Sequence, residues 1–267
     1  MPSSTPPLGQ HFLKYMPVAH RIVNLLGPTL HDVILEIGPG RGILTDLLVD
    51  RAKHLILIER DLCMIGHLKA KFNHPHISIL HNDARNLDIE TINQHYGHKL
   101  NVISNLPFYA ATFILKKLLE QKRYIKQMVL MFQMEVAKRI LAKPGSKDYG
   151  NLSIFTQLDS IVEMGLFIPK TAFSPQPKVD ATVLRLIPYE APRIAPKNEA
   201  LFKELIHILF QNRRKMVQTT LKNSPFRSLL TDKRTALIKE HGLELTIRPE
   251  QMNIEKLCFL SDILSQK

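Results

Sequence analysis

The sequence has few of the residues that would place it in a disulfide-rich, metal-bound or membrane-embedded class. Its 267 residues include no tryptophan and two cysteines, Cys63 and Cys258, far apart in the chain. This usage fits a reducing compartment and excludes a disulfide framework. No His-Glu-x-x-His or paired-cysteine spacing occurs, so no metal site is predicted.

Long apolar runs are also missing, and none reaches the length that crosses a bilayer. The first ten residues are rich in proline, serine and threonine and do not have the pattern of a signal peptide. We therefore expect a cytoplasmic protein with no membrane partner.

Positive charge is what the chain has in excess. Lysine and arginine number 36 against 24 acidic residues, a net charge of +12. Half of that excess lies in residues 191–267. Such a balance predicts a polyanionic partner, either nucleic acid or an anionic surface, although a solvated helical face would also explain the charge of the tail.

Short apolar runs alternate with helical patterns from residue 33 onward. This alternation predicts an α/β fold with a parallel, doubly wound sheet that binds its ligand at the carboxyl ends of the strands. The expected strands are 33–37, 55–59, 77–80, 100–104, 128–132, 161–167 and 181–187, and the expected helices are 44–51, 111–121 and 135–142.

Three prolines, at positions 188, 192 and 196, indicate a linker after these elements. We expect a domain at 1–190 and a smaller helical domain at 191–267. Pro249 and Glu250 suit the start of a helix. The expected helices of the second domain are 199–210, 215–221, 233–241 and 250–264.

A glycine turn follows the first expected strand, in Glu36-Ile-Gly38-Pro-Gly40-Arg-Gly42. Glycine permits positive φ and lets the backbone approach a ligand closely. A nicotinamide dinucleotide site needs its third glycine at position 43, where Ile43 stands, so an oxidoreductase is disfavoured. The spacing instead resembles the first motif of class I methyltransferases, which bind S-adenosyl-L-methionine; a purely structural turn is the alternative.

Two acids follow the next two expected strands. Glu59 ends the second strand and could accept both ribose hydroxyls of a nucleoside, while Asp83 follows the third and could accept its adenine amine. Each acid alone is more often a cap or a surface charge. Their order behind the glycine turn predicts a cofactor site.

The fourth expected strand leads into Asn105-Leu106-Pro107-Phe108. This turn resembles the motif of enzymes that methylate exocyclic amines on bases. The N6 lone pair of adenine is delocalised, so two acceptors that hold both N–H bonds would help: the Asn105 side chain and the Leu106 carbonyl, with Pro107 fixing the turn. Phe108 could stack on the base. An ordinary asparagine turn is the alternative.

Together, segments along nearly the whole chain resemble the KsgA family of small-subunit ribosomal RNA adenine dimethyltransferases. Besides the motifs above, the resembling segments are 9–13, 131–139, 149–153, 173–180, 210–215 and 248–250. The resemblance implies a class I (Rossmann-like) methyltransferase fold with a smaller C-terminal helical domain. Two residues depart from the usual pattern, His11 for asparagine and Phe108 for tyrosine.

The resemblance also assigns roles to single residues. Phe173 would face Phe108 across the target base. RNA phosphates would contact Arg213, Arg214 and Lys215. The implied binding positions for S-adenosyl-L-methionine are His11, Leu13, Gly38, Gly40, Glu59, Asp83 and Asn105.

The implied substrate is a pair of adjacent adenosines in a hairpin loop near the 3′ end of small-subunit (16S) rRNA, each dimethylated at N6. The implied partner is a pre-30S ribosomal particle, met by a monomeric enzyme during small-subunit biogenesis. Two alternatives are an Erm-like enzyme acting on large-subunit rRNA and a non-catalytic ribosome assembly factor that retains the fold.

Overall fold

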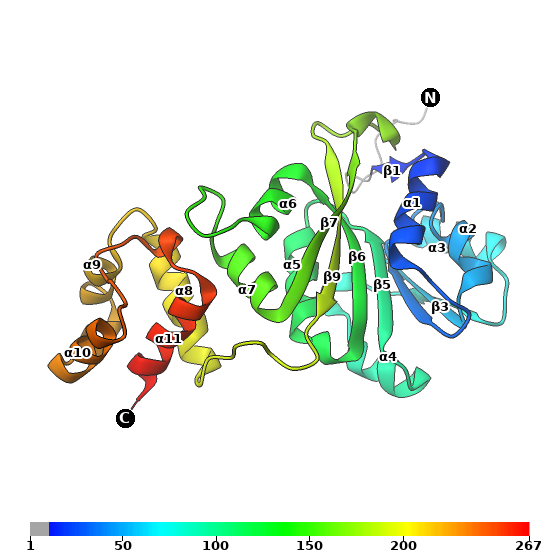
Figure 1. Ribbon diagram of the computed structural model, residues 1–267. Helices are drawn as coiled ribbons and strands as arrows, with labels where there is room; N and C mark the ends of the chain where they lie inside the picture. The colour runs from blue at the N-terminus through cyan, green and yellow to red at the C-terminus, as the bar shows by residue number, and fades with distance from the viewer. Residues whose placement is uncertain (1–10, 267) are drawn as a thin grey trace. The chain divides into compact units, whose positions relative to one another are not determined.

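The computed structural model describes residues 11–266, and this part of the chain forms two compact units (Figure 1). One unit takes the described chain up to Ala137 together with Ser160–Glu190. The other takes Lys138–Asp159 and the described chain from Ala191 on. The segment Lys138–Asp159 thus belongs to the second unit, although we expected it in the first domain. Within this segment, Tyr149 and Ile154 are fully buried in the same apolar cluster as Phe202, which explains the difference.

A sheet of seven strands forms the first unit within the described residues, in the order β4-β3-β2-β5-β6-β9-β7. Neighbouring strands from β4 to β6 are parallel, whereas β9 is antiparallel to both β6 and β7. The predicted fold class is confirmed. The bounds are β2 Val33–Ile37, β3 His54–Glu59, β4 Ile77–His81, β5 Leu100–Asn105, β6 Ile125–Gln133, β7 Ser160–Ile168 and β9 Ala181–Pro188.

The strand order reverses between β2 and β5. From β2 the chain continues outward through β3 and β4, and it then returns to the other side of β2 with β5 and β6. The carboxyl ends of β2 and β5 flank this switch point, which is where doubly wound sheets bind ligands. All five residues of β2 are buried, as expected of a central parallel strand covered on both faces.

Helices cover the sheet of the first unit (Figure 1). The buried side of α1, with Ile22 and Leu26, packs against β6, β7 and β9. Burial extends to Leu35 of β2, Val102 of β5 and Leu115 of α5. The bounds are α1 Met16–Leu26, α2 Thr45–Leu48, α3 Leu62–Lys71, α4 Ile89–Tyr96 and α5 Ala111–Glu120, with α6 Met134–Leu141 at the boundary between units.

A short ladder fixes the first described residues to a distant part of the same unit. Strand β1, Phe12–Leu13, pairs antiparallel with β8, Phe173–Ser174, so that Leu13 lies opposite Phe173. Next to the ladder, Lys14 N donates to the Ala172 carbonyl at 2.9 Å. This pairing sets where His11 lies.

The second unit is helical. Its bounds are α7 Asn151–Asp159, α8 Glu199–Gln211, α9 Val217–Lys222, α10 Asp232–Glu240 and α11 Ile254–Ser265. The expectation of one helix from residue 250 is wrong. Pro249–Gln251 forms a separate 3₁₀ turn. The last helix begins after Asn253 because that side chain accepts the Lys256 N–H at 2.9 Å and caps it.

Between residues 11 and 266, no helix has both the length and the apolar character required to cross a membrane.

Candidate active site

A pocket lies at the carboxyl ends of the parallel strands, within the first unit. The glycine turn after β2, the end of β3, the loop after β4 and the turn after β5 all line it. Most of the residues singled out in the sequence lie on its wall. They are His11, Leu13, Gly38, Gly40, Glu59, Asp83, Asn105, Leu106, Pro107 and Phe108.

All three glycines of the glycine turn have positive φ, and Gly38 and Gly40 use this freedom in different ways. Gly38 has φ +66°, and a Cβ built there would meet nothing within 4 Å, so it would project into open space. Gly40 has φ +56°, and a Cβ built there would lie 2.9 Å from the ring of Phe12. Gly38 therefore keeps the pocket open, whereas Gly40 lets the β1 segment pack against the turn.

Glu59 connects the end of β3 to this turn. Its Oε2 accepts the Gly40 N–H at 3.2 Å, and its Oε1 accepts the N–H groups of Arg60 and Asp61 at 2.8 and 2.9 Å. A carboxylate offers about four acceptor positions, so the buried Glu59 side chain retains capacity for a ligand hydroxyl.

Asp83 is engaged by two arginines that sequence reasoning missed. Arg85 donates to Oδ1 through Nε at 3.0 Å and to Oδ2 through Nη2 at 2.6 Å. Arg60 Nη1 lies 3.6 Å from the same Oδ2. The hydrogen bonds from Arg85 lower the pKa of Asp83 to about 2. The carboxyl is thus held ionised, and a cofactor amine would share it with these guanidinium groups.

Glu36 is a buried acid in the pocket wall. Its side chain is 1% exposed, and its Oε2 accepts a hydrogen bond from Thr45 Oγ1 at 2.7 Å. Burial raises the pKa of Glu36 to about 8, and the nearby Asp46 and Glu59 carboxyls add to the effect. Glu36 is therefore mostly protonated near neutral pH. In the sequence it stood out only as the first position of the glycine motif.

The turn after β5 is held at both ends. Ser104 Oγ donates to the Ile37 carbonyl at 2.6 Å, which joins β5 to the start of the glycine turn. The Leu106 side chain is buried, and the Pro107 carbonyl accepts the Ala110 N–H at 2.9 Å. The backbone of residues 105–108 is thus held in place by contacts within the protein.

The side chain of Asn105 has a defined orientation. Its Nδ2 donates to the backbone carbonyl of His11 at 3.2 Å. Its Oδ1 accepts no hydrogen bond from the residues that the structure describes. The amide nitrogen is therefore committed to the β1 segment, and the oxygen of this pocket-lining residue is left without a partner among the described residues.

His11 is itself fixed. Its Nδ1 lies 2.7 Å from the Pro175 carbonyl, and because a carbonyl only accepts, Nδ1 is the protonated nitrogen. In the neutral ring, Nε2 is then an acceptor. The imidazole lies 5.9 Å from the Phe108 ring between centroids.

Phe173 lies next to Phe108, the residue that it is expected to face across the target base. Its ring is 1% exposed and belongs to the apolar core, opposite Leu13 in the ladder. Its centroid is 6.4 Å from that of Phe108, with an edge-to-face angle of 67°. Phe173 thus contacts Phe108 directly and supports that ring.

The three predicted RNA-binding residues lie in the second unit and differ in their surroundings. Arg213 donates to Glu250 Oε2 through Nε at 3.1 Å and through Nη2 at 2.7 Å. Arg214 and Lys215 are exposed and form no ion pair with any other described residue. Two of the three cations are therefore free to meet phosphates, while Arg213 is held inside its own unit.

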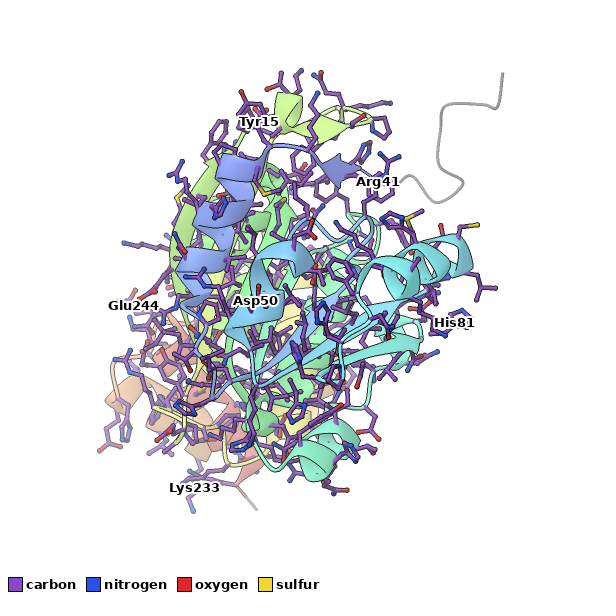
Figure 2. All side chains as sticks on the ribbon, turned by 90° about the vertical axis from the view of Figure 1, so that its right-hand side faces the viewer. Tyr15, Arg41, Asp50, His81, Lys233 and Glu244 are labelled. Atoms are coloured by element: carbon purple, nitrogen blue, oxygen red, sulfur yellow. The ribbon has the colours of Figure 1, made fainter. Side chains whose placement is uncertain are left out.

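Sequence reasoning missed several residues of the pocket wall, among them Phe12, Arg41, Arg60 and Tyr109. Arg41 lies over the Phe12 ring, 4.9 Å from its centroid, beside β1 (Figure 2). Phe12 and Arg41 lie inside motifs that the sequence showed, and Arg60 and Tyr109 directly follow residues that it singled out, but the motifs gave these four residues no role of their own. Within the described chain, no three His, Cys, Asp or Glu side chains gather in a way that could hold a metal ion.

Comparisons with known proteins agree with this geometry. Residues 3–266 match the family model described as ribosomal RNA adenine dimethylase. The ribosomal RNA small subunit methyltransferase A of Latilactobacillus sakei is 37% identical over 265 residues, covering 97% of this chain and 89% of the relative. The protein of that name from Blochmanniella pennsylvanica is 38% identical over 260 residues, covering 97% and 94%.

Two crystal structures share the fold over almost the whole chain. A dimethyladenosine transferase from Plasmodium falciparum has a TM-score of 0.81 at 24% identity and covers 94% of this chain and 96% of that one. The 23S rRNA methyltransferase ErmE has a TM-score of 0.71 at 22% identity and covers 96% and 100%.

The sheet order, the glycine turn and the acids at the strand ends define a class I, S-adenosylmethionine-dependent methyltransferase. The chain belongs to the ribosomal RNA adenine dimethylase family. The pocket residues fit S-adenosylmethionine, because Gly38 leaves open the space that a Cβ would enter and carboxylates suited to ribose hydroxyls and an amine stand beside it.

Proposed function

We propose that this protein dimethylates N6 of two adjacent adenosines in a hairpin loop near the 3′ end of 16S rRNA. One observation carries this proposal: the amide of Asn105, a residue that lines the pocket, is tied through its nitrogen, and its oxygen has no partner among the described residues. Relatives 37–38% identical to the chain bear the name of a small-subunit rRNA methyltransferase, which favours this RNA over large-subunit rRNA.

The residues around the turn position the reacting amine. When bound, S-adenosylmethionine supplies a methyl group on a positively charged sulfur. Glu59 and Asp83 would hold its nucleoside, and Gly38 would admit it. The Asn105 oxygen and the Leu106 carbonyl would accept the two N–H bonds of N6, so that the nitrogen lone pair is directed into the pocket. No strong base is required, because the proton leaves readily once the nitrogen has gained a methyl group.

Phe108 would form the face on which the target adenine stacks. A ring face stabilises positive charge developing on the amine by up to about 2 kcal/mol in a dry site. Contacts with His11 and Phe173 keep this ring in place. A loop adenosine suits such a pocket, because an unstacked base enters at low cost.

The second unit would bind the rest of the RNA. Residues 191–267 carry a net charge of +6, and the exposed Arg214 and Lys215 would contact phosphates. Affinity should then fall steeply with salt. The proposed partner is a pre-30S particle in the cytoplasm, bound by a monomeric enzyme.

The test is mass spectrometry of rRNA nucleosides. Purified protein is incubated with S-adenosylmethionine and undermethylated small subunits, and large subunits are treated in parallel. N6,N6-dimethyladenosine should form in the small-subunit RNA alone. Modification of the large subunit would support the Erm-like alternative, and unmodified RNA in both arms would indicate a non-catalytic assembly factor.

A further inference from the structure

Two arginines lie beside the pocket without a role in the chemistry described above. Arg60 lines the pocket wall at the end of β3, and Arg85 follows the loop after β4. Each side chain is 46% exposed, and both approach Asp83 Oδ2, at 3.6 and 2.6 Å. The shared carboxylate therefore holds two guanidinium groups together at the surface.

The two guanidinium groups share one carboxylate. Both approach the same oxygen of Asp83. Among neighbouring acids, Asp61 caps α3 by accepting the Cys63 N–H, and Glu59 is buried and accepts three backbone N–H groups. Because a guanidinium group has five N–H donors, Arg60 and Arg85 keep donors that Asp83 does not use.

The cofactor does not account for these unused donors. S-adenosylmethionine has no phosphate, and its one carboxylate is on the methionine part, at the opposite end of the molecule from the adenine amine that Asp83 would bind. A guanidinium group instead matches phosphate oxygens in charge and geometry. The cationic pair therefore indicates an anionic ligand that is present together with the cofactor, which in this enzyme is the RNA backbone.

An exposed aromatic ring stands next to the arginines. Tyr109 directly follows Phe108, lines the pocket and is 60% exposed. Its hydroxyl accepts a hydrogen bond from Arg60 Nη1 at 3.4 Å. An exposed ring beside a guanidinium group is the arrangement on which unstacked bases of single-stranded RNA bind.

We propose that Arg60, Arg85 and Tyr109 form a subsite for the nucleotide that flanks the target adenosine. The two guanidinium groups bind its phosphate, and the Tyr109 ring stacks on its base. This subsite rests on the proposed function, since it needs a single-stranded RNA whose neighbouring base is delivered to residues 105–108. In a pair of adjacent adenosines, the flanking base is the second target.

The experiment compares Arg60→Gln, Arg85→Gln, Tyr109→Ala and Tyr109→Phe with the wild-type chain. Arg123→Gln is the matched control, because Arg123 also pairs with an acid, Glu90, at 3.1 Å but does not line the pocket. Undermethylated small subunits are bound at several KCl concentrations with S-adenosylhomocysteine present. The KM for the same subunits is measured separately, and calorimetry gives the affinity for S-adenosylhomocysteine.

Each arginine substitution should raise the KM for small subunits several-fold and make the slope of log affinity against log salt shallower by about 0.7. Tyr109→Ala should weaken binding by about 5- to 150-fold, the range of one base–aromatic stack, and Tyr109→Phe should recover most of that loss. Affinity for S-adenosylhomocysteine should stay within about twofold of the wild type. Since a tenfold change in Kd corresponds to about 1.4 kcal/mol, this is a small change in binding free energy. Arg123→Gln should match the wild type.

An unchanged salt slope and KM in both arginine variants would overturn the subsite. So would a loss of cofactor affinity large enough to explain the weaker RNA binding. Because binding is measured without methyl transfer, a wild-type chain that binds subunits but leaves them unmodified would contradict the proposed function and not the subsite.

Discussion

The side-chain nitrogen of Asn105 donates a hydrogen bond to the backbone carbonyl of His11, which lies 94 residues earlier in the chain. The contact joins the β1 segment to the turn that we propose to be catalytic. It also fixes the sense of the amide, because the nitrogen is used and the oxygen has no partner among the described residues. The proposed function therefore requires a residue at position 105 that both donates and accepts.

Asn105→Asp tests this double requirement. The carboxylate keeps an acceptor for N6 but cannot donate to the His11 carbonyl, and two acceptors would then face each other. We expect methyl transfer to fall by about 100-fold, the usual cost of misplacing a reacting group. Single-turnover transfer from labelled cofactor measures the rate.

Asn93→Asp provides the matched control. Asn93 lies in helix α4 and does not line the pocket, and its Nδ2 donates to the His98 carbonyl at 2.7 Å. This variant should transfer methyl groups like the wild type. Equal rates in Asn105→Asp and Asn93→Asp would remove the orienting role of the His11 contact.

Gly40→Ala should damage both folding and cofactor binding. The new Cβ would lie 2.9 Å from the Phe12 ring at a φ of +56°. Gly97 has a φ of +70° and nothing within 4 Å of a built Cβ. Gly97→Ala should therefore cost only the strain of a positive φ, about 1–2 kcal/mol, without a steric clash. We expect denaturant unfolding to show a larger loss in Gly40→Ala, and calorimetry to show weaker cofactor binding there only. Identical behaviour of the two variants would contradict the packing argument.

The buried Glu36 should make stability depend on pH. Its pKa is raised to about 8 in the folded chain from its ordinary value of 4.5, so the folded state holds a proton that the unfolded state releases between these values. The free energy of unfolding contributed by this group therefore falls as pH rises from about 4.5 to about 8.

Glu36→Gln removes that dependence. Between pH 5.5 and pH 8, the wild type should lose at least about 1 kcal/mol more stability than Glu36→Gln, on the scale of 1.36 kcal/mol per pKa unit. Urea unfolding at both pH values measures the difference. Asp83 does not interfere, because its pKa of about 2 confines its contribution to more acidic conditions. Parallel pH profiles in the two proteins would show that Glu36 is ionised throughout.

Substitutions of Arg213 and Arg214 should have different effects, the first on stability and the second on RNA binding. Arg213→Gln breaks a partly exposed, two-donor contact with Glu250 and should cost about 1 kcal/mol of unfolding free energy. Arg214→Gln should leave stability unchanged and make the salt slope of small-subunit binding shallower by about 0.7–0.9. Thermal unfolding and subunit binding distinguish the two. If Arg214→Gln lost stability and still bound small subunits as the wild type does, the role proposed for Arg214 in RNA binding would be wrong.

Local spacing in the sequence was sufficient to predict which of the pocket residues would lie together. The glycine turn, the acids after β3 and β4 and the turn after β5 follow strands whose apolar runs are plain, and the pocket brings all of them together. Helices α3 and α4 were missed because their apolar stripes are narrow: two residues of α3 and one of α4 are buried.

Local sequence patterns could not predict the contacts between residues that lie far apart in the chain. The β1–β8 ladder pairs two-residue strands that no periodicity marks, and it buries Phe173, which the family resemblance implied would face Phe108 across the target base. The segment Lys138–Asp159 is close in sequence to the sheet strands, yet Tyr149 and Ile154 bury their side chains in the second unit. Arg60 and Arg85 meet only because β3 and β4 are neighbours in the sheet.

The most direct measurement is the single-turnover rate of methyl transfer from labelled S-adenosylmethionine to undermethylated small subunits by Asn105→Ala, alongside its affinity for those subunits. The available oxygen of Asn105 predicts a rate lower by about 100-fold or more with subunit binding largely unchanged. A rate equal to that of the wild type would contradict the account.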